Sequence, residues 1–199
     1  SARKLSKGDF SISSDIQVRS RDEIGILGAS FLDMSKDLET SYKKLEEYSN
    51  RYRSLFEYSP TSLWEEDFCE VKIYIDGLRN KGIQDFRTYF RDHPEELKHC
   101  TDMIRILDVN DATLKLYGAD TKEALIQNLD RILTDKSHDI LKEQVLTIAE
   151  GKTFEIQCVN KTLKDKDITV LMKASIPPGY EENWGKVLIS VHALSERMR

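Results

Sequence analysis

Histidine and cysteine are the residue types in this 199-residue chain that most often carry chemistry. His93 and the adjacent pair His99-Cys100 are potential metal or haem ligands, but isolated histidines are more often surface or capping residues, and we favour that interpretation. Cys69 and Cys158 are potential redox sensors. Cys158 falls on the apolar positions of an alternating run, which favours a packed thiol. No metal site and no required cofactor are predicted, and haem is disfavoured.

Acidic pairs are the other chemically suggestive residues, as in Glu65-Glu66 and Glu181-Glu182. Their members are adjacent in sequence, which does not indicate a catalytic cleft. The sequence has no GxxxxGK phosphate loop, no HExxH and no nucleophile elbow, so no catalytic residue is predicted. The net charge of −5 without a basic patch argues against nucleic acid as a partner. Three cysteines without a CxxC motif argue against a disulfide framework and favour a reducing compartment.

The strongest pattern is a heptad repeat of apolar residues, which we call the heptad seam. It begins at Ile24 and ends at Leu55, directly after the acidic sequence Asp22-Glu23-x-Gly25. The spacing alternates three and four residues without a skip, and Ser41 is its one polar member. This is typical of a left-handed coiled coil, so the segment is predicted to form a homodimer. The apolar seam residues are Ile24, Leu27, Phe31, Met34, Leu38, Leu45, Tyr48, Tyr52 and Leu55.

Beyond the coiled coil the sequence predicts a domain of mixed helices and strands. Ser59-Pro60 ends the long helix, because proline disfavours helix in the residue before it. Short helices are predicted around 71–78, 86–90, 111–117, 122–127 and 140–149, with Asn110 as one N-cap, and a further helix is predicted to start at 93–96. The aromatic residues Phe86, Tyr89 and Phe90 have helical spacing, which favours core packing over the lining of a ligand cavity.

Alternating apolar residues predict a meander of three strands at the end of the chain. The runs lie around 154–158, 168–176 and 187–191, and two earlier strands are predicted at 61–64 and 104–109. The fold class is therefore α+β, with a five-stranded antiparallel sheet and flanking helices. The inward face of the meander is predicted to line an apolar ligand pocket with Ile156, Cys158, Val170, Met172 and Ile189.

Two sequence segments resemble parts of PAS domains. Ile104 to Ala119 resembles the second strand and following helix, in which Val109-Asn110-x-Ala112 ends the strand and Tyr117-Gly118 closes the helix. The chain's end resembles the PAS exit, where the family commonly has Asp-Ile-Thr-Glu-Arg. Ala193 stands where that motif has aspartate, so we expect the relay either to differ from that of the family or to run through Glu196 and Arg197 instead. The helical stretch at about 65–103 is unusual for this family.

The beginning of the chain resembles the second half of a HAMP domain. Gly8 matches the connector glycine, and Asp22-Glu23-x-Gly25 matches the start of the second HAMP helix, which the resemblance makes a signal relay. We therefore predict a HAMP-like segment at 1–50, with its first helix truncated, and a PAS-like sensor domain at 51–199. The chain starts within the pattern, so we expect it to be a piece of a longer protein.

The two resemblances together imply a sensory and signal-transmission module of a transmembrane receptor, most often a two-component sensor histidine kinase. They imply a position on the cytoplasmic side of the membrane, a downstream output domain and a response regulator as a partner of the parent. The alternatives are a PAS-like dimerisation scaffold without a ligand, or a module of a cyclic-dinucleotide synthase or chemotaxis receptor. Ser137-His138-Asp139 resembles a kinase phosphoacceptor box only faintly, and a surface histidine is the favoured interpretation.

Overall fold

The computed structural model describes residues 23–132 and 135–194. The chain divides into two compact units, Ser1–Leu55 and Phe56–Arg199. Across the described residues, none of the helices combines the length and apolarity needed to cross a bilayer.

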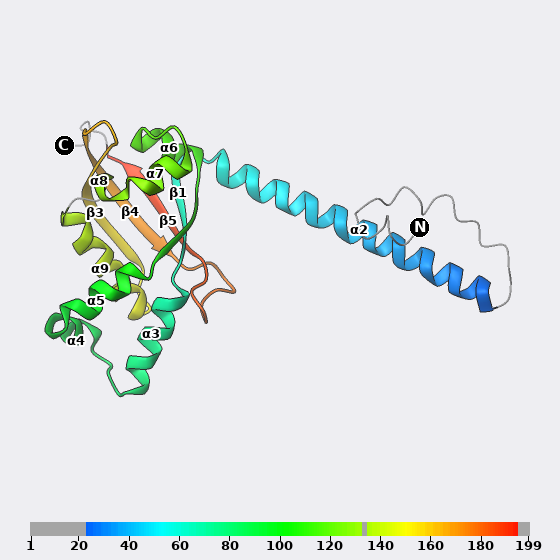
Figure 1. The fold of residues 1–199 in the computed structure, drawn as a ribbon, viewed down its shortest axis with the longest axis horizontal. Coiled ribbons are helices and arrows are strands. Elements are labelled where there is room, and N and C mark those ends of the chain that lie inside the picture. Colours follow the sequence, from blue (N-terminus) through cyan, green and yellow to red (C-terminus); the bar gives the residue numbers. More distant parts are fainter. Residues whose placement is uncertain (1–22, 133–134, 195–199) are drawn as a thin grey trace. The chain divides into compact units, whose positions relative to one another are not determined.

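The first unit contains most of helix α2, which runs from Glu23 to Glu57 over 35 residues (Figure 1). At 1.5 Å per residue the helix is about 52 Å long. The predicted helix over 24–55 is confirmed, and its end lies just before the Ser59-Pro60 sequence that disfavours helix. A turn at Tyr58 follows the helix. The last two residues of the helix, Phe56 and Glu57, belong to the second unit.

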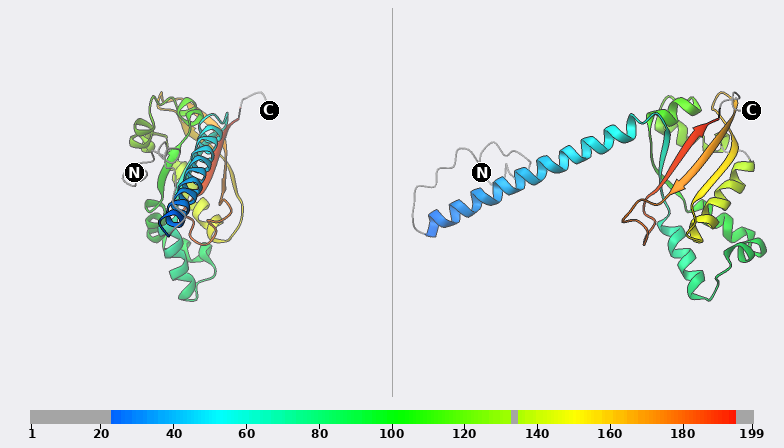
Figure 2. Two further views of the ribbon diagram at one scale, coloured as in Figure 1. Left: turned by 90° about the vertical axis from the view of Figure 1, so that its right-hand side faces the viewer. Right: turned by 180° about the vertical axis from the view of Figure 1, so that it is seen from behind.

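The second unit is built on one five-stranded antiparallel sheet with the order β2-β1-β5-β4-β3. The predicted α+β fold class, a PAS-like five-stranded sheet with flanking helices, is confirmed. The last three strands form the predicted meander, and the two earlier strands extend the sheet on the side of β5 (Figure 2, right). The strands are β1 (Ser62–Asp67), β2 (Arg105–Val109), β3 (Phe154–Lys161), β4 (Asp167–Ser175) and β5 (Val187–Ala193).

Strand pairing places the apolar alternation on one inner face of the sheet. Trp64 is opposite Ile189, and Cys158 is opposite Val170. In β5 the inward side chains are almost wholly buried, whereas Leu188 between them is only half-buried. This alternation is the burial pattern expected when one face of an antiparallel sheet covers the core.

Three helices lie between β1 and β2, in the region predicted as a helical insertion. They are α3 (Cys69–Asn80), α4 (Phe86–Asp92) and α5 (Pro94–Asp102). Phe86 and Phe90 are buried, as their helical spacing predicts. Pro94 occupies the first turn of α5, where its missing N–H costs nothing. A bidentate contact from Arg87 to Glu143 connects α4 to the later helix α9 (Asp135–Ala149).

Four more helices connect β2 to β3. They are α6 (Asp111–Tyr117), α7 (Lys122–Gln127), α8 (Leu129–Ile132) and α9 (Asp135–Ala149). Gly118 ends α6 with φ of 71°, a left-handed conformation that glycine adopts without a steric penalty. Helices α8 and α9 lie against β3, in front of the sheet in Figure 1. The space between these helices and the inner face of the sheet holds the cavity of the candidate site.

Candidate functional site

A cavity of about 290 Å³ lies between the inner face of the sheet and the helices that cover it. Its walls are mostly apolar, as in small-molecule sites, and a few polar side chains interrupt them. The apolar and aromatic lining residues are Trp64, Ile104, Ile106, Tyr117, Leu129, Ile132, Leu141, Met172, Ile189 and Val191.

The five residues predicted for an apolar pocket all lie on the inner face, but they divide into two groups. Met172 and Ile189 line the cavity. Ile156, Cys158 and Val170 pack in the surrounding core instead. The Cys158 thiol lies 3.5 Å from the Met172 sulfur, and burial raises its pKa to about 11, so it remains a neutral, packed thiol.

The carboxyl group of Glu66 is the most unusual feature of the cavity. Glu66 is only 8% exposed, although it lies near the middle of the sheet, where it pairs with Val187 of β5. The Gln144 side-chain amide donates a hydrogen bond to it over 3.3 Å. Burial raises the pKa of Glu66 to about 7, against a smaller opposite effect of the Gln144 hydrogen bond. No ion pair within the described part of the chain includes Glu66.

A second polar group in the cavity joins α6 to β3. The Asn160 side-chain amide donates a hydrogen bond to the Tyr117 hydroxyl over 2.8 Å. Burial raises the pKa of Tyr117, so its hydroxyl stays protonated at neutral pH. The Tyr117 ring meets Trp64 edge-on at 5.7 Å between centroids. The rings of Trp64 and Tyr117, the Tyr117 hydroxyl and the Asn160 amide therefore all line the cavity.

Asn110 connects the end of α2 to the sheet and to α6. As predicted, Asn110 caps α6, because its side-chain oxygen accepts from the Thr113 backbone N–H at 3.0 Å. The same oxygen accepts from the Leu63 N–H at 3.0 Å. Its amide nitrogen donates to the backbone carbonyls of Phe56 and Thr61, at 3.0 and 2.9 Å. Asn110 is wholly buried, so these bonds fix the start of the domain without competition from water.

Lys122 of α7 forms a second connection to the end of α2. Its ammonium group lies 2.7 Å from a carboxylate oxygen of Glu57 and 2.6 Å from one of Asp108. Burial alone lowers the pKa of Lys122, but the hydrogen bonds to the two carboxylates outweigh it and the pKa is raised. The ammonium therefore stays charged and holds Glu57, the last residue of α2, together with α7 and β2.

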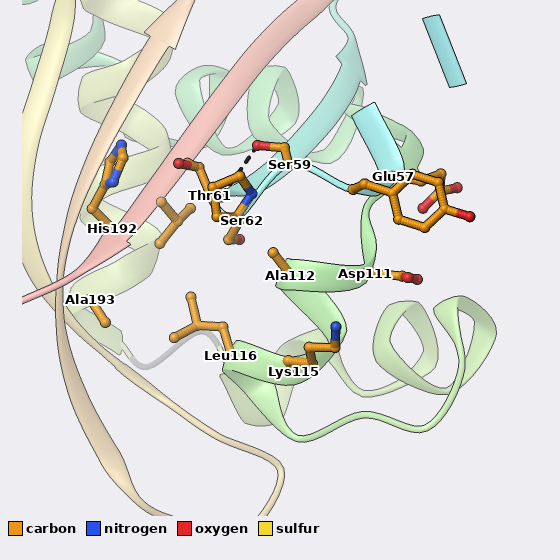
Figure 3. Close-up of a pocket in the computed structure, with 13 residues that line it drawn as sticks. Glu57, Ser59, Thr61, Ser62, Asp111, Ala112, Lys115, Leu116, His192 and Ala193 are labelled. Atoms are coloured by element: carbon orange, nitrogen blue, oxygen red, sulfur yellow. Dashed lines mark hydrogen bonds between the residues drawn. The ribbon is translucent and has the colours of Figure 1, made fainter. Parts of the chain in front are cut away.

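A surface hollow of about 570 Å³ lies next to this junction (Figure 3). Its lining brings together the segment that leads into β1 and the last residues of β5, which are the beginning and end of the domain. The Thr61 N–H donates to the Ser59 hydroxyl over 3.2 Å and shapes one wall. Ala193 lines the hollow together with His192 and Leu116.

The predicted relay residues are only partly described by the structure. Gly25 lies in α2, and the backbone of Glu23 begins that helix. Asp22, Glu196 and Arg197 lie outside the described residues. The relay assignment of all five residues stays a prediction.

The heptad seam lies along α2, where Ile24 is the second residue of the helix. Phe31 is half-buried. The other described apolar seam side chains are 49–72% exposed; they are Leu27, Met34, Leu38, Leu45, Tyr48, Tyr52 and Leu55.

The polar residues of the cavity were not predicted from the sequence as site residues; they are Glu66, Thr101, Asp102, Tyr117, Asp130, Gln144 and Asn160. Glu66 was considered only with Glu65, as an adjacent pair without a cleft. The pattern that identifies Glu66 is its place two residues after Trp64, at an inward position of a buried strand. Gln144 and Asn160 gave no comparable pattern, because a single amide on a helix or strand is usually exposed. Among the described residues, no group of three or more histidine, cysteine or acidic side chains has the geometry to hold a metal ion.

Comparisons with known proteins add two observations. The HAMP domain model matches residues 1–40, and a search of curated proteins found no match. A domain of a sensory box sensor histidine kinase/response regulator from Geobacter sulfurreducens is 19% identical, with a TM-score of 0.46 over 74% of this chain and 96% of that one. The PAS domain of an HTR-like protein from Haloarcula marismortui is 18% identical, with a TM-score of 0.46 over 78% and 99%.

A third similar structure is the LOV protein of Rhodobacter sphaeroides, which is 12% identical, with a TM-score of 0.49 over 77% of this chain and 71% of that one. The predicted order of a HAMP segment followed by a PAS-like fold is confirmed.

Proposed function

We propose that this chain is a signal-transmission module in which two copies of α2 pair as a parallel coiled coil and pass a conformational change to the PAS-like domain. The PAS-like domain senses a small molecule in its cavity, and the segment after β5 passes the combined signal to an output domain. The parent is a membrane-anchored receptor, and we assign it to the two-component sensor histidine kinases, with a response regulator as its partner.

The observation that carries this proposal is the exposed heptad seam of α2. A single helix with a continuous apolar stripe over more than four heptads gains stability by pairing the stripe with a second helix. Leu38 and Leu45 are more than half exposed, so burial against a second copy removes apolar surface from water at about 25 cal/mol per Å². The seam continues to Leu55, one residue before the Phe56 carbonyl that Asn110 binds.

This covalent continuity supports transmission into the sensing domain. A shift or rotation of the paired helices acts directly on Phe56 and Glu57, which Asn110 and Lys122 connect to α6 and α7. Packed helices and interfaces tend to have discrete alternative arrangements rather than continuous deformations, so a small displacement can select between two states. The hollow beside Ser59 and Ala193 lies where the first and last segments of the domain meet, a suitable place for the two to influence each other.

The test uses the full-length parent in membranes, with autophosphorylation as the readout. Two variants, Glu23→Ala at the start of α2 and Lys122→Ala in α7, which removes the ammonium that pairs with Glu57, are each expected to change basal phosphorylation at least twofold. Lys142→Ala is the matched control, because Lys142 pairs with the exposed Asp139 at i,i+3 within its own helix. No phosphorylation in any variant or the wild type would reject the kinase assignment. Phosphorylation that the two variants leave unchanged would reject the relay.

A further inference from the structure

The charged groups around the cavity share one sign. Glu66, Asp102 and Asp130 line it, whereas none of its described lining residues is lysine, arginine or histidine. We propose that the cavity binds a small organic cation, an amine or amidine with an apolar body, whose charged group pairs with Glu66. This inference rests on the proposed function, in which the cavity is the sensing site of the domain.

The position of Glu66 provides the first argument. A buried carboxylate is costly unless an opposite charge or several hydrogen bonds compensate the loss of water. The side chain of Gln144 supplies one hydrogen bond of 3.3 Å and no charge. Gln144 is itself buried, so its side chain is held in place and fixes the orientation of the Glu66 carboxyl group. A ligand cation would supply the missing charge, and its apolar body would replace water along the isoleucine and leucine walls.

The aromatic residues of the cavity provide the second argument. Trp64 and Tyr117 line the same space as Glu66, with their rings held edge-to-face at 5.7 Å. The face of an aromatic ring attracts cations, tryptophan most strongly, and the attraction grows when water is excluded. Trp64 is itself buried, which places its ring in such a water-poor environment.

The exposed acids provide the third argument. Asp102 at the end of α5 and Asp130 in α8 are exposed residues that line the cavity from the helical side. Carboxylates around an opening raise the local concentration of cations and repel anions. An anionic ligand would meet three carboxyl groups and, among the described lining residues, no compensating cation.

The size of the cavity limits the ligand. A volume of about 290 Å³ is just below the roughly 300–1,000 Å³ of most ligand pockets. At about 30 Å³ per non-hydrogen atom, the share of one water molecule in the liquid, it holds roughly ten such atoms. Phenethylamine has this size, and 2-phenylethanol and phenylacetate match its shape while carrying no charge or a negative charge.

Proton release provides a specific signature of pairing at Glu66. Its pKa of about 7 leaves the carboxyl group near half protonated at neutral pH, and a bound cation favours the ionised form. The other described titratable groups that line the cavity are Asp102, Asp130 and Tyr117; the two acids also favour a cation, and the tyrosine stays protonated. Cation binding at pH 7 should therefore release about half a proton, whereas a carboxylate ligand should take up protons.

Isothermal titration calorimetry of the purified chain at pH 7, in buffers of different ionisation enthalpy, tests the proposal. Phenethylamine is expected to bind at least tenfold more tightly than either analogue and to release protons. Glu66→Gln should weaken its binding at least tenfold and abolish the release, whereas Glu155→Gln, on the exposed part of β3, should change neither. Because Glu66→Gln lies in the core, Asp130→Asn at an exposed position is a second variant, expected to weaken binding two- to threefold.

The outcomes separate this inference from the proposed function. Tighter binding of 2-phenylethanol or phenylacetate would overturn the cationic ligand class and leave the cavity as a sensing site. Binding of phenethylamine that neither Glu66→Gln nor Asp130→Asn weakens would overturn the role of the acids. If none of the three compounds binds and none raises the melting temperature, the cationic ligand class is rejected, and the sensing role of the cavity keeps its own test in a screen of other small molecules. The coiled-coil relay has its own test in the phosphorylation assay.

Discussion

The side-chain amide of Asn110 donates a hydrogen bond to the backbone carbonyl of Phe56 over 3.0 Å. The last carbonyls of a helix have no partner within the helix, so an external donor is needed when they are buried. Asn110 fills that role at the end of α2 while its oxygen caps the start of α6. One buried side chain thus joins Phe56, near the end of the long helix, to the first helix after β2.

Asn110→Ala should lower the free energy of unfolding of the PAS-like domain by about 3 kcal/mol. The variant leaves the partly buried N–H of Leu63 and the carbonyl of Thr61 without their Asn110 partner, at about 1–3 kcal/mol for an unsatisfied group. Urea unfolding followed by the fluorescence of the two tryptophans measures the change. Thr121→Ala, which removes the exposed N-cap of α7, is the control and should cost about 1 kcal/mol. Equal losses of unfolding free energy in Asn110→Ala and Thr121→Ala would show that Asn110 acts only as a helix cap.

The stability of the PAS-like domain should fall as the pH rises from about 4.5 to 7. Glu66 keeps its proton in the folded state up to a pKa of about 7, whereas the unfolded chain releases it near 4.5. The unfolded state therefore binds fewer protons in this window, and the contribution of Glu66 reaches about 3 kcal/mol at roughly 1.4 kcal/mol per pKa unit.

Urea unfolding of wild type and Glu66→Gln at pH 5 and 8 isolates this contribution. The glutamine cannot ionise, so the variant should lose the decline and should be the more stable protein at pH 8. Glu155→Gln, whose carboxylate pairs with Lys173 at the surface, should follow the wild type. A wild-type protein that is equally stable at both pH values would contradict the raised pKa.

The heptad seam predicts opposite effects for two substitutions in α2. Leu38→Asp should raise the dimer dissociation constant at least a hundredfold, because a buried charge without a partner is costly. Ser41→Leu should tighten the dimer by adding apolar burial at a seam position. Sedimentation equilibrium of the chain measures both, with the exposed Lys44→Gln as control. A wild-type chain that sediments as a monomer at all concentrations would reject the coiled coil.

Lys122→Ala should destabilise the PAS-like domain by about 1 kcal/mol. The ammonium is partly exposed, so solvent screening reduces its contribution, but its loss also leaves the Glu57 and Asp108 carboxylates without their shared cation. Lys152→Ala removes a more exposed pair with Glu150 and should change stability by less than 0.5 kcal/mol. Thermal melts at low and high salt compare the stability of the two variants. A loss of stability in Lys152→Ala equal to that in Lys122→Ala would contradict a special role for the contacts of Lys122 with Glu57 and Asp108.

Much of the fold could be predicted from local sequence patterns. The heptad repeat predicted α2, Asn110 and Gly118 predicted both ends of α6, and alternation predicted the three strands of the meander. These patterns report interactions between residues that are close in sequence: caps, turns and the periodicity of a buried face. They also placed Met172 and Ile189 on the inner face of the sheet.

The tertiary structure alone decided which inward residues line the cavity and which fill the core. Cys158 and Val170 share a face with Met172, but the cavity reaches only Met172. The Gln144–Glu66 bond joins residues 78 positions apart, and the Asn110–Phe56 bond joins residues 54 apart. The sequence by itself determined the period of each element and thus its buried face. It did not determine which distant polar groups meet there, because that depends on strand order, register and helix placement, which are set by the packing of the whole domain.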